Sequence, residues 1–164
     1  MEIREIQIED AKNLLNLLKK LDAETTFLLY EKDERNSTIE QQRKNIQEQL
    51  EKGSLTFVLE DNKKLVGYVF GNIFTANRKK HCMNLAIAIL QEYTGKGYGT
   101  KLMNTIEEYA INNGITRLEL EVAKTNKVAI SLYQKTGFEE EGIKRNAFLV
   151  NGKYEDELLM AKII

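Results

Sequence analysis

Three glycines at alternate positions, Gly95, Gly97 and Gly99, have the spacing in this chain that most clearly indicates chemistry. They follow an uncharged apolar run over 85–90 and precede apolar residues at helical spacing, which predicts a strand, a loop and a helix. Glycine adopts backbone conformations closed to other residues, so several N–H groups can point at one spot. Because a helix N-terminus carries unpaired N–H groups and the positive end of the helix dipole, this loop is predicted to bind a phosphate.

The residues in and after the glycine loop exclude two common phosphate-binding motifs. A P-loop has Lys followed by Ser or Thr after its last glycine, whereas Gly99 is followed by Thr100 and then Lys101. A dinucleotide-binding loop has G-x-G-x-x-G, whereas these glycines are each two positions apart. The loop is therefore either a phosphate site of another kind or a turn that only begins a helix.

A second stretch with candidate functional residues runs from Asn126 to Phe138, NKVAISLYQKTGF. It follows an alternating run over 117–122, RLELEV, which predicts a strand. Asn126 is a favourable N-cap, and Gly137 is a favourable residue at the C-terminal end of the helix that follows. The order of strand, short loop and helix therefore occurs twice.

The glycine loop and the pattern N-x-x-A-x-x-L-Y-x-x-x-G-F together resemble the two signatures of the GCN5-related N-acetyltransferase (GNAT) family, in that family's order. The resemblance covers nearly the whole chain, and its motifs are most similar to those of the ribosomal-protein alanine acetyltransferase-like branch. It implies an acetyl-CoA-dependent acyltransferase that acetylates amines. It also implies an α/β (α+β) fold with one domain over 1–164: a mixed, mostly antiparallel sheet of about six or seven strands, splayed between strands 4 and 5, with about four helices.

The resemblance assigns most of the candidate site to acetyl-CoA. The loop amides would hold its diphosphate, and the Asn126 side chain would contact its pantetheine arm. The family usually has Arg or Gln at the position where this chain has Thr94. The cofactor-binding residues expected on this basis are Ile87, Ala88, Ile89, Gly95, Lys96, Gly97, Tyr98, Gly99, Thr100 and Asn126.

Acetyl transfer from a thioester to an amine needs a neutral amine, a donor for the developing oxyanion and an acid for the leaving thiolate. The resemblance points to the Ile89 N–H as the oxyanion donor and to Tyr133 as the acid. A tyrosine suits this role because its ordinary pKa of about 10 keeps it protonated at neutral pH. Glu121, on the predicted fifth strand, is the candidate base, because the ribosomal-protein alanine acetyltransferase branch has a glutamate there that acts through water. The alternatives are a Tyr133 that only packs in the core and a Glu121 that is a solvated surface charge.

The resemblance implies that the amine acceptor lies against the irregular segment 27–36 and the predicted last hairpin, which turns at Asn151-Gly152. Acidic side chains on the segment would attract a cation, and aromatic side chains would supply a wall. The residues assigned to the acceptor are Phe27, Tyr30, Glu31, Glu34 and Tyr154. A solvated loop with a few apolar anchors is the alternative. A weak base would favour α-amines or other amines of low pKa as acceptors.

Length and composition limit the function further. A chain of 164 residues is expected to form one domain with a substantial core. Lys and Arg number 24 against 25 for Asp and Glu, and the net charge of −1 argues against a nucleic-acid partner. The single cysteine, Cys82, cannot form an internal disulfide, and no apolar run reaches membrane-spanning length. We therefore expect a cytoplasmic protein with no membrane partner. The lone His81-Cys82 pair has no further ligands beside it, so no metal site is expected. The resemblance implies that a homodimer can form, because dimers are common in the family.

The other elements are predicted from periodicity, caps and turn signals. An edge strand over 2–8 precedes a helix capped by Asp10, and a capping box of Ser37 and Glu40 opens a second helix. Two hairpins are expected, one from 54–59 and 65–74 and the other from 140–150 and 154–163.

Three classes of function remain open on the sequence alone. The favoured class is an acetyltransferase that uses an amine acceptor. The second is a non-catalytic acyl-CoA-binding domain that senses the cofactor, and the third is a nucleotide-binding or interaction domain that shares only a glycine loop. Tyr133 and Glu121 favour catalysis over sensing, and the absence of a P-loop lysine disfavours the third class.

Overall fold

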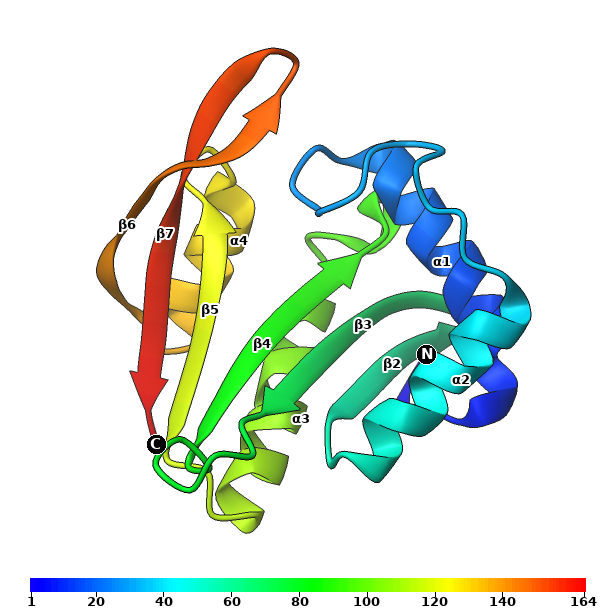
Figure 1. Ribbon diagram of the computed structural model, residues 1–164, viewed down its shortest axis with the longest axis horizontal. Helices are drawn as coiled ribbons and strands as arrows, with labels where there is room; N and C mark the ends of the chain where they lie inside the picture. The colour runs from blue at the N-terminus through cyan, green and yellow to red at the C-terminus, as the bar shows by residue number, and fades with distance from the viewer. The chain divides into compact units, whose positions relative to one another are not determined.

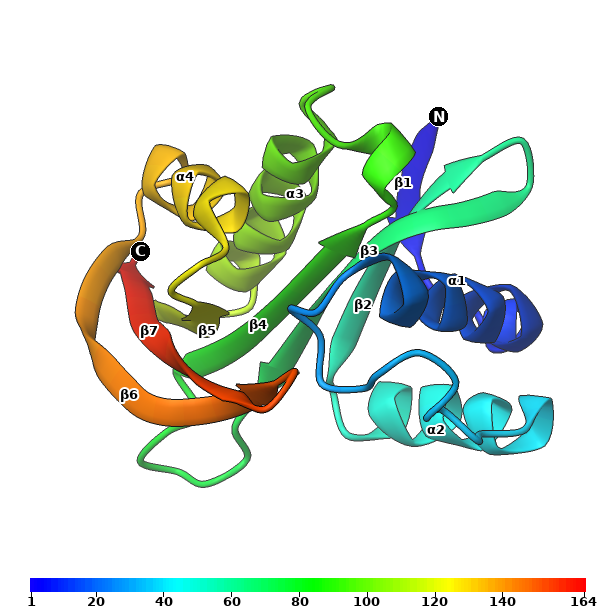
Figure 2. The same cartoon turned by 90° about the horizontal axis from the view of Figure 1, so that it is seen from above.

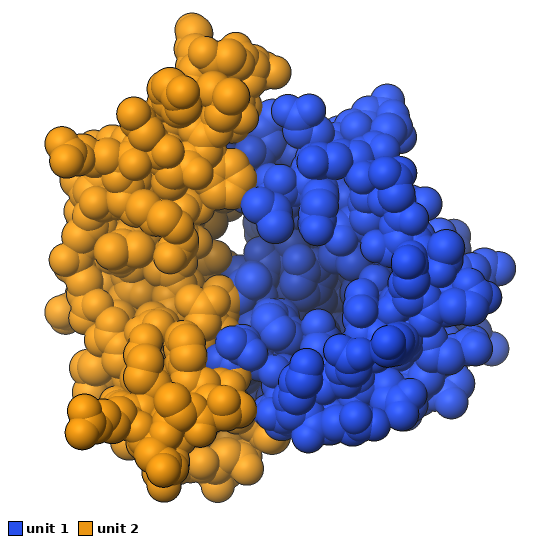
Figure 3. Space-filling view, in the orientation of Figure 1, with its two compact units in different colours: residues 1–72, 86–106 blue, residues 73–85, 107–164 orange.

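Seven strands and four α-helices follow one another along the chain in the computed structural model, which describes residues 1–164 (Figure 1). The chain divides into two units, coloured separately in Figure 3. Unit 1 comprises Met1–Asn72 and Ala86–Ile106, and unit 2 comprises Ile73–Leu85 and Glu107–Ile164. The strand β4 (Cys82–Ile89) and the helix α3 (Tyr98–Asn112) each contribute to both units.

Unit 1 contains an antiparallel sheet and two helices. Its elements are β1 (Glu2–Glu5), α1 (Ala11–Glu24), α2 (Ile39–Glu51), β2 (Leu55–Asp61) and β3 (Lys64–Ile73). β2 pairs with both β1 and β3, and the two helices lie side by side in Figures 1 and 2. Leu14, Leu17 and Leu21 recur at helical spacing on α1 and are buried, as are Val58 and Val69 on the strands. These residues form much of the core of unit 1.

Unit 2 contains the C-terminal strands and one short helix. Its elements are β5 (Arg117–Ala123), α4 (Lys127–Lys135), β6 (Glu139–Val150) and β7 (Lys153–Ile163). The first three residues of β4 and β5 pair in parallel, and β7 is antiparallel to both β5 and β6. Leu118, Leu120 and Val122 are buried on one face of β5. Glu119 and Glu121 alternate with them on the opposite, more exposed face.

The strand order of the sheet is β1-β2-β3-β4-β5-β7-β6. The β4–β5 pair is parallel, whereas β1–β2, β2–β3, β5–β7 and β6–β7 are antiparallel. The predicted α+β fold class, with a mixed and mostly antiparallel sheet and four helices, is confirmed. None of the helices has both the length and the apolar character needed to cross a bilayer.

Both predicted hairpins are present, and their turns have left-handed backbone angles. The first was expected to turn through Asp61, Asn62 and Lys63, but Asp61 belongs to β2. Asn62 and Lys63 have φ of 47° and 64°, and Asn151 and Gly152 have φ of 50° and 75°. Two consecutive left-handed residues are typical of a type I′ turn, whose twist matches that of the flanking strands. These turns join β2 to β3 and β6 to β7.

The start of the chain differs from the prediction in two details. β1 ends at Glu5 instead of continuing to residue 8. Asp10 is the N-cap residue of α1, as predicted, but its carboxylate makes no cap hydrogen bond to the helix. It accepts instead from the Gln7 N–H and from both terminal nitrogens of the Arg4 guanidinium. Arg4 therefore competes with the helix for this carboxylate, and it lowers the pKa of Asp10 below its usual value.

The predicted cap of α2 is displaced by one residue. Thr38 Oγ1 accepts from the Gln41 N–H at 3.2 Å, and Gln41 Oε1 accepts from the Thr38 N–H at 2.8 Å. This reciprocal pair is a capping box, and Thr-x-x-Gln fits that pattern as well as the Ser37 and Glu40 pair does. The type of cap is therefore confirmed, whereas its position is corrected.

Candidate active site

The glycine loop lies between a short 3-10 helix, Gln91–Tyr93, and α3. Gly95 and Gly97 have φ of 72° and 83°, a left-handed conformation that glycine adopts without strain. A Cβ added to either glycine would meet no atom within 4 Å. These glycines are therefore required by backbone conformation and not by crowding, and the loop has open space beside it.

The first turn of α3 presents backbone N–H groups at the end of this loop. A hydrogen bond from the Lys101 N–H to the Gly97 carbonyl, at 3.2 Å, closes the turn. The N–H groups of Tyr98, Gly99 and Thr100 precede this bond, and the first N–H groups of a helix have no acceptor within it. The helix dipole places its positive end at the same point. The loop therefore has the donors and the electrostatic character of an anion-binding site.

Side-chain hydrogen bonds fix this loop within unit 1, and most of them come from residues that were not predicted to belong to the site. The Tyr93 hydroxyl donates to Asp61 Oδ2 at 2.9 Å, and this hydrogen bond raises the pKa of Tyr93. Glu24 Oε2 accepts from the Gln91 N–H at 3.0 Å, and Thr94 Oγ1 donates to the Gln91 carbonyl at 2.8 Å. The Tyr93 and Asp61 contact joins residues 32 positions apart, so a local pattern in the sequence does not reveal it.

Two lysines add positive charge near the loop. Lys96 Nζ lies 5.4 Å from the centroid of the Tyr93 ring, and Lys101 Nζ lies 5.6 Å from that of the Tyr98 ring. A cation–π contact at an exposed site contributes about 0.5–1 kcal/mol, so an anion can readily compete for either ammonium group. Lys96 was among the predicted cofactor residues, whereas Lys101 was not.

The end of β4 over 87–89 carries apolar side chains that are only half-buried. On β3, Gly67 lies against this segment. A Cβ added to Gly67 would lie 2.9 Å from Ile89 Cγ1 and 3.1 Å from the Ala88 carbonyl oxygen. Gly67 therefore permits the close approach of β3 to the predicted oxyanion donor. A glycine inside a predicted strand is the signal that could have identified it.

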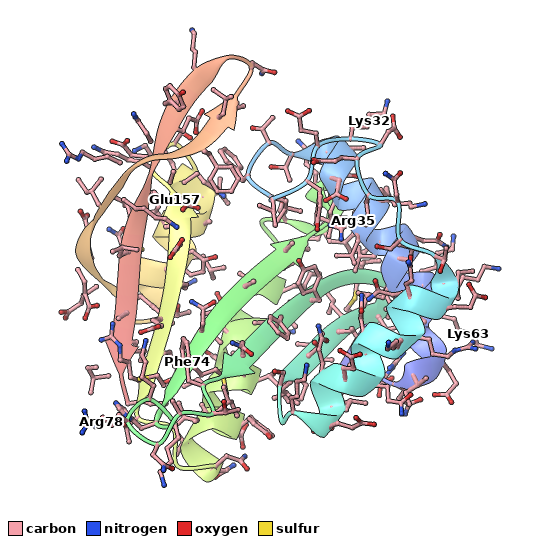
Figure 4. All side chains as sticks on the ribbon, viewed as in Figure 1. Lys32, Arg35, Lys63, Phe74, Arg78 and Glu157 are labelled. Atoms are coloured by element: carbon pink, nitrogen blue, oxygen red, sulfur yellow. The ribbon has the colours of Figure 1, made fainter.

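The irregular segment 27–36 is anchored through Arg35, which Figure 4 labels. Its guanidinium donates to the two carboxylate oxygens of Asp22 at 2.7 and 3.1 Å, and it lies 4.5 Å from the centroid of the Tyr30 ring. The Asp22 side chain is 1% exposed. Removing the Arg35 cation would leave the buried Asp22 carboxylate without its partner, which is unfavourable. The ion pair therefore holds the segment 27–36 against α1.

The residues assigned to the acceptor differ in their surroundings. Phe27 and Tyr30 are each 39% exposed, so both can form part of a wall. Glu34 Oε2 accepts from the Glu31 N–H at 2.8 Å, and this carboxylate therefore shapes the segment itself. Tyr154 belongs to β7 in unit 2, where it is 67% exposed. The structure places the first four of these residues on one segment of unit 1.

In unit 2, Asn126 caps α4 as predicted. Its Oδ1 accepts from the Ala129 N–H at 3.2 Å, and the side-chain NH₂ group can still donate to another molecule. Further along the helix, Tyr133 is 6% exposed, and its ring lies against that of Phe138 with centroids 5.9 Å apart. Gly137 has φ of 92° directly after the helix, as expected of its C-terminal end.

Glu121 belongs to a cluster of charged side chains on β5, β6 and β7. Its Oε2 accepts from Lys144 Nζ at 2.7 Å, and the same ammonium lies 3.7 Å from Glu157 Oε2. The Glu157 side chain is 10% exposed, against 43% for Glu121. Burial raises the pKa of Glu157, and hydrogen bonding and charge repulsion from Glu121 raise it further, whereas Lys144 lowers it. Neither Glu157, labelled in Figure 4, nor Lys144 was predicted from the sequence.

The predicted site residues are thus divided between the two units. Unit 1 contains the end of β4, the glycine loop and the segment 27–36. Unit 2 contains Glu121, Asn126, Tyr133 and Tyr154. Within unit 1 the loop follows β4 directly, and within unit 2 the candidate base is held in a network of charged side chains.

Comparison with known proteins identifies the family of this chain. The model of the acetyltransferase (GNAT) family matches residues 15–138, which is most of the sequence. The chain therefore belongs to this family, as the two motifs predicted.

Similar proteins differ in the acceptor for which they are named. Spermidine N(1)-acetyltransferase of Vibrio cholerae serotype O1 is 34% identical over 102 residues, which are 61% of this chain and 58% of that protein. The ribosomal protein bS18 alanine N-acetyltransferase of Escherichia coli (strain K12) is 35% identical over 75 residues, 46% of this chain and 51% of that protein. The chain thus spans less than two thirds of either relative.

The fold is also found among solved structures. The crystal structure of an acetyltransferase of the GNAT family from Streptococcus pneumoniae matches with a TM-score of 0.94 and 32% sequence identity. The match covers 99% of this chain and 99% of that one. The fold predicted from the resemblance is therefore confirmed over nearly the whole chain.

Proposed function

We propose that this protein transfers an acetyl group from acetyl-CoA to a primary amine, by direct attack of the amine in a ternary complex. Acetyl-CoA is the acetyl donor of the family to which the chain belongs. The observation that carries the proposal is the glycine loop, in which Gly95 and Gly97 are left-handed, have open space beside them and precede the N-terminus of α3. Such a loop presents several N–H donors to a diphosphate.

The residues present fit acetyl-CoA. The backbone N–H groups over 95–100 and the ammonium of Lys96 would hold the diphosphate, and Lys101 would add charge. The NH₂ group of Asn126 would donate to the pantetheine arm, because the cap of α4 uses only the carbonyl oxygen of that side chain. The half-buried residues over 87–89 would offer backbone groups and apolar contact to the same arm.

Acetyl-CoA supplies a thioester, whose carbonyl carbon the amine attacks and whose sulfur leaves as a thiolate. The Ile89 N–H would donate to the carbonyl oxygen as negative charge develops there, and one such donor contributes about 3 kcal/mol. Tyr133 would give its hydroxyl proton to the departing sulfur. A carboxylate of the Glu121 cluster would take the proton of the amine, directly or through water.

The acceptor we propose is an α-amine of a protein N-terminus or a small-molecule amine of low pKa. An amine must be neutral to attack, and at pH 7 this costs about 4–5 kcal/mol for a lysine of pKa about 10.4 but only about 1 kcal/mol for an α-amine of pKa about 7.8. One similar protein is named for spermidine and another for an alanine of ribosomal protein bS18. Small-molecule and protein acceptors therefore both occur among similar proteins.

The test is release of free thiol from acetyl-CoA in the presence of a panel of amines. The panel comprises a peptide with a free N-terminal alanine, a free amino acid, spermidine, and a peptide with a blocked N-terminus and one lysine. We expect release that requires both the protein and an amine, and that is faster with the α-amines than with the lysine peptide at pH 7. Binding of acetyl-CoA without thiol release for any amine would instead assign the protein to the non-catalytic acyl-CoA-sensing class.

Three broader expectations accompany this proposal. We propose that the chain forms one domain over 1–164, that it works in the cytoplasm and that it can form a homodimer. The net charge of −1 supports a small-molecule or peptide partner over a nucleic acid.

A further inference from the structure

Glu157 is a carboxylate in the middle of the C-terminal strands. It lies on β7, where it is paired in register with Ala123 of β5 on one side and with Lys144 of β6 on the other. Residues directly opposite on neighbouring strands point to the same face of a sheet. The Glu157 side chain is 10% exposed, and acidic side chains are seldom so buried without a partner.

The cation of the cluster is shared unequally between the two carboxylates. Lys144 Nζ lies 2.7 Å from Glu121 Oε2, the length of a charge-assisted hydrogen bond, but 3.7 Å from Glu157 Oε2, which is beyond hydrogen-bond range. Glu121 therefore has both the shorter contact with the cation and the greater exposure to water. Glu157 has a longer contact with Lys144 and less exposure to water, so its negative charge is less stabilised than that of Glu121.

The proton affinity of Glu157 follows from this arrangement. Burial and the neighbouring Glu121 both raise its pKa, and Lys144 offsets part of this effect. A general base is most effective when its pKa is close to the working pH. Of the two carboxylates, Glu157 is therefore the better suited to take a proton at neutral pH.

We propose that Glu157 is the carboxylate that accepts the proton of the acceptor amine, and that Glu121 and Lys144 position it. The inference rests on the proposed acetyl transfer. In that reaction the amine nitrogen bonds to the acetyl carbon, the carbon–sulfur bond breaks, and a proton passes from the nitrogen to a Glu157 oxygen, directly or through one water. The sulfur takes a proton from the Tyr133 hydroxyl, and water then restores both side chains to their starting protonation.

The other charged side chains near this cluster have partners elsewhere. Glu119, on the same face of β5, pairs with Arg117 at 2.8 Å. On β7 itself, Glu155 accepts from the Thr125 hydroxyl at 2.7 Å, and Asp156 accepts from a backbone N–H of β6 at 2.9 Å. Glu121 and Lys144 are therefore the charged groups that act on Glu157.

The first experiment compares Glu157→Gln with the wild type. This variant keeps the shape and burial of the side chain but removes its basicity. We expect kcat/KM at pH 7 to fall by about 100-fold or more, the effect of losing a general base, with calorimetric binding of acetyl-CoA unchanged. Glu140→Gln is the matched control, because Glu140 is exposed on β6 and the change in charge is the same. A Glu157→Gln enzyme within about threefold of the wild type would overturn the proposal.

The pH profile separates the two carboxylates. Glu121→Gln removes the repulsion that raises the pKa of Glu157, so the rising limb of kcat/KM should move to lower pH while activity persists. Lys144→Gln removes the cation that lowers this pKa, so the limb should move to higher pH. A base at Glu121 predicts the reverse pattern: Glu121→Gln abolishes activity, and Glu157→Gln shifts only the limb.

The outcomes also distinguish this inference from the proposed function. A wild-type protein that binds no acetyl-CoA, or releases no thiol with any amine, contradicts the proposed function itself. An active wild type with an equally active Glu157→Gln variant contradicts only the role of Glu157. If thermal melting shows that Glu157→Gln is unfolded, the opposite shifts expected for Glu121→Gln and Lys144→Gln decide the matter, and an unmoved limb in both would overturn the inference.

Discussion

Gly67 of β3 lies directly against Ile89 of β4. A Cβ on Gly67 would be 2.9 Å from Ile89 Cγ1 and 3.3 Å from Ile89 Cα. The first contact would force the Ile89 side chain to shift, and the second is tight enough to displace the Ile89 backbone slightly. Position 67 therefore determines where the Ile89 N–H, the proposed oxyanion donor, can lie.

Replacing Gly67 with alanine tests this relationship. Gly67→Ala should displace Ile89 and lower kcat by about tenfold or more, because an oxyanion donor acts only when it is correctly placed. Binding of acetyl-CoA should change little, which calorimetry would show. Gly142→Ala on β6 is the control, since an added Cβ there meets Leu159 at an ordinary 3.8 Å. Equal kcat values for the two variants would argue against Ile89 as the donor.

Replacing Gly97 with alanine tests the glycine loop. The φ of 83° at this position is unfavourable for alanine by about 1–2 kcal/mol, so the loop should rearrange and its N–H groups should turn away from the diphosphate. We expect the Kd for acetyl-CoA to rise by about tenfold. Gly53→Ala has the same strain, with φ of 75° and open space around it, but lies outside the loop. A similar loss of affinity in both variants would count against the glycine loop as the diphosphate-binding site.

A substitution of Thr94 is expected to strengthen the binding of acetyl-CoA, because the family usually has Arg or Gln at this position. Its hydroxyl closes the 3-10 turn through the Gln91 carbonyl. Thr94→Arg should lower the Kd for acetyl-CoA a few-fold at low ionic strength, and the gain should shrink as salt screens the added charge. Thr94→Val, which removes the hydroxyl without adding charge, should show no gain. A salt-independent Kd in Thr94→Arg would mean that the position does not face the diphosphate.

Arg35 offers a test of the acceptor side. Lysine at this position keeps the charge but cannot donate to both oxygens of Asp22 in the same plane. The segment 27–36 should loosen, so the KM for the amine should rise several-fold while the Kd for acetyl-CoA stays constant. Lys32→Arg, an equally conservative change on the same exposed segment, should leave both constants unaltered. An unchanged amine KM in Arg35→Lys would remove this segment from the acceptor site.

Features that depend on neighbouring residues could be predicted from the sequence. The turn at Asn151-Gly152 has a backbone conformation that few other residue pairs favour. The cap at Asn126 involves an N–H three residues away. The conformation of the glycine loop could be predicted for the same reason, since it depends on local backbone angles and on the helix that follows.

Features that depend on long-range pairing could not be predicted. Lys144 and Glu121 are 23 positions apart, and their contact depends on the register of β5, β7 and β6. Asp10 was assigned to the wrong partner because Arg4, on the preceding strand, binds its carboxylate. A glycine inside a strand could mark Gly67 as a place of close approach, but the sequence does not reveal that its neighbour is Ile89, on another strand.

Calorimetric titration of the folded protein with acetyl-CoA is the most direct test of the glycine loop as a coenzyme A site. We expect a saturable heat with one ligand per chain for acetyl-CoA and for CoA, and at least tenfold weaker binding in Gly97→Ala than in Gly53→Ala, about 1.4 kcal/mol at equal temperature. No measurable heat with either ligand, from protein that melts cooperatively, would contradict the site and the acetyl transfer proposed for it.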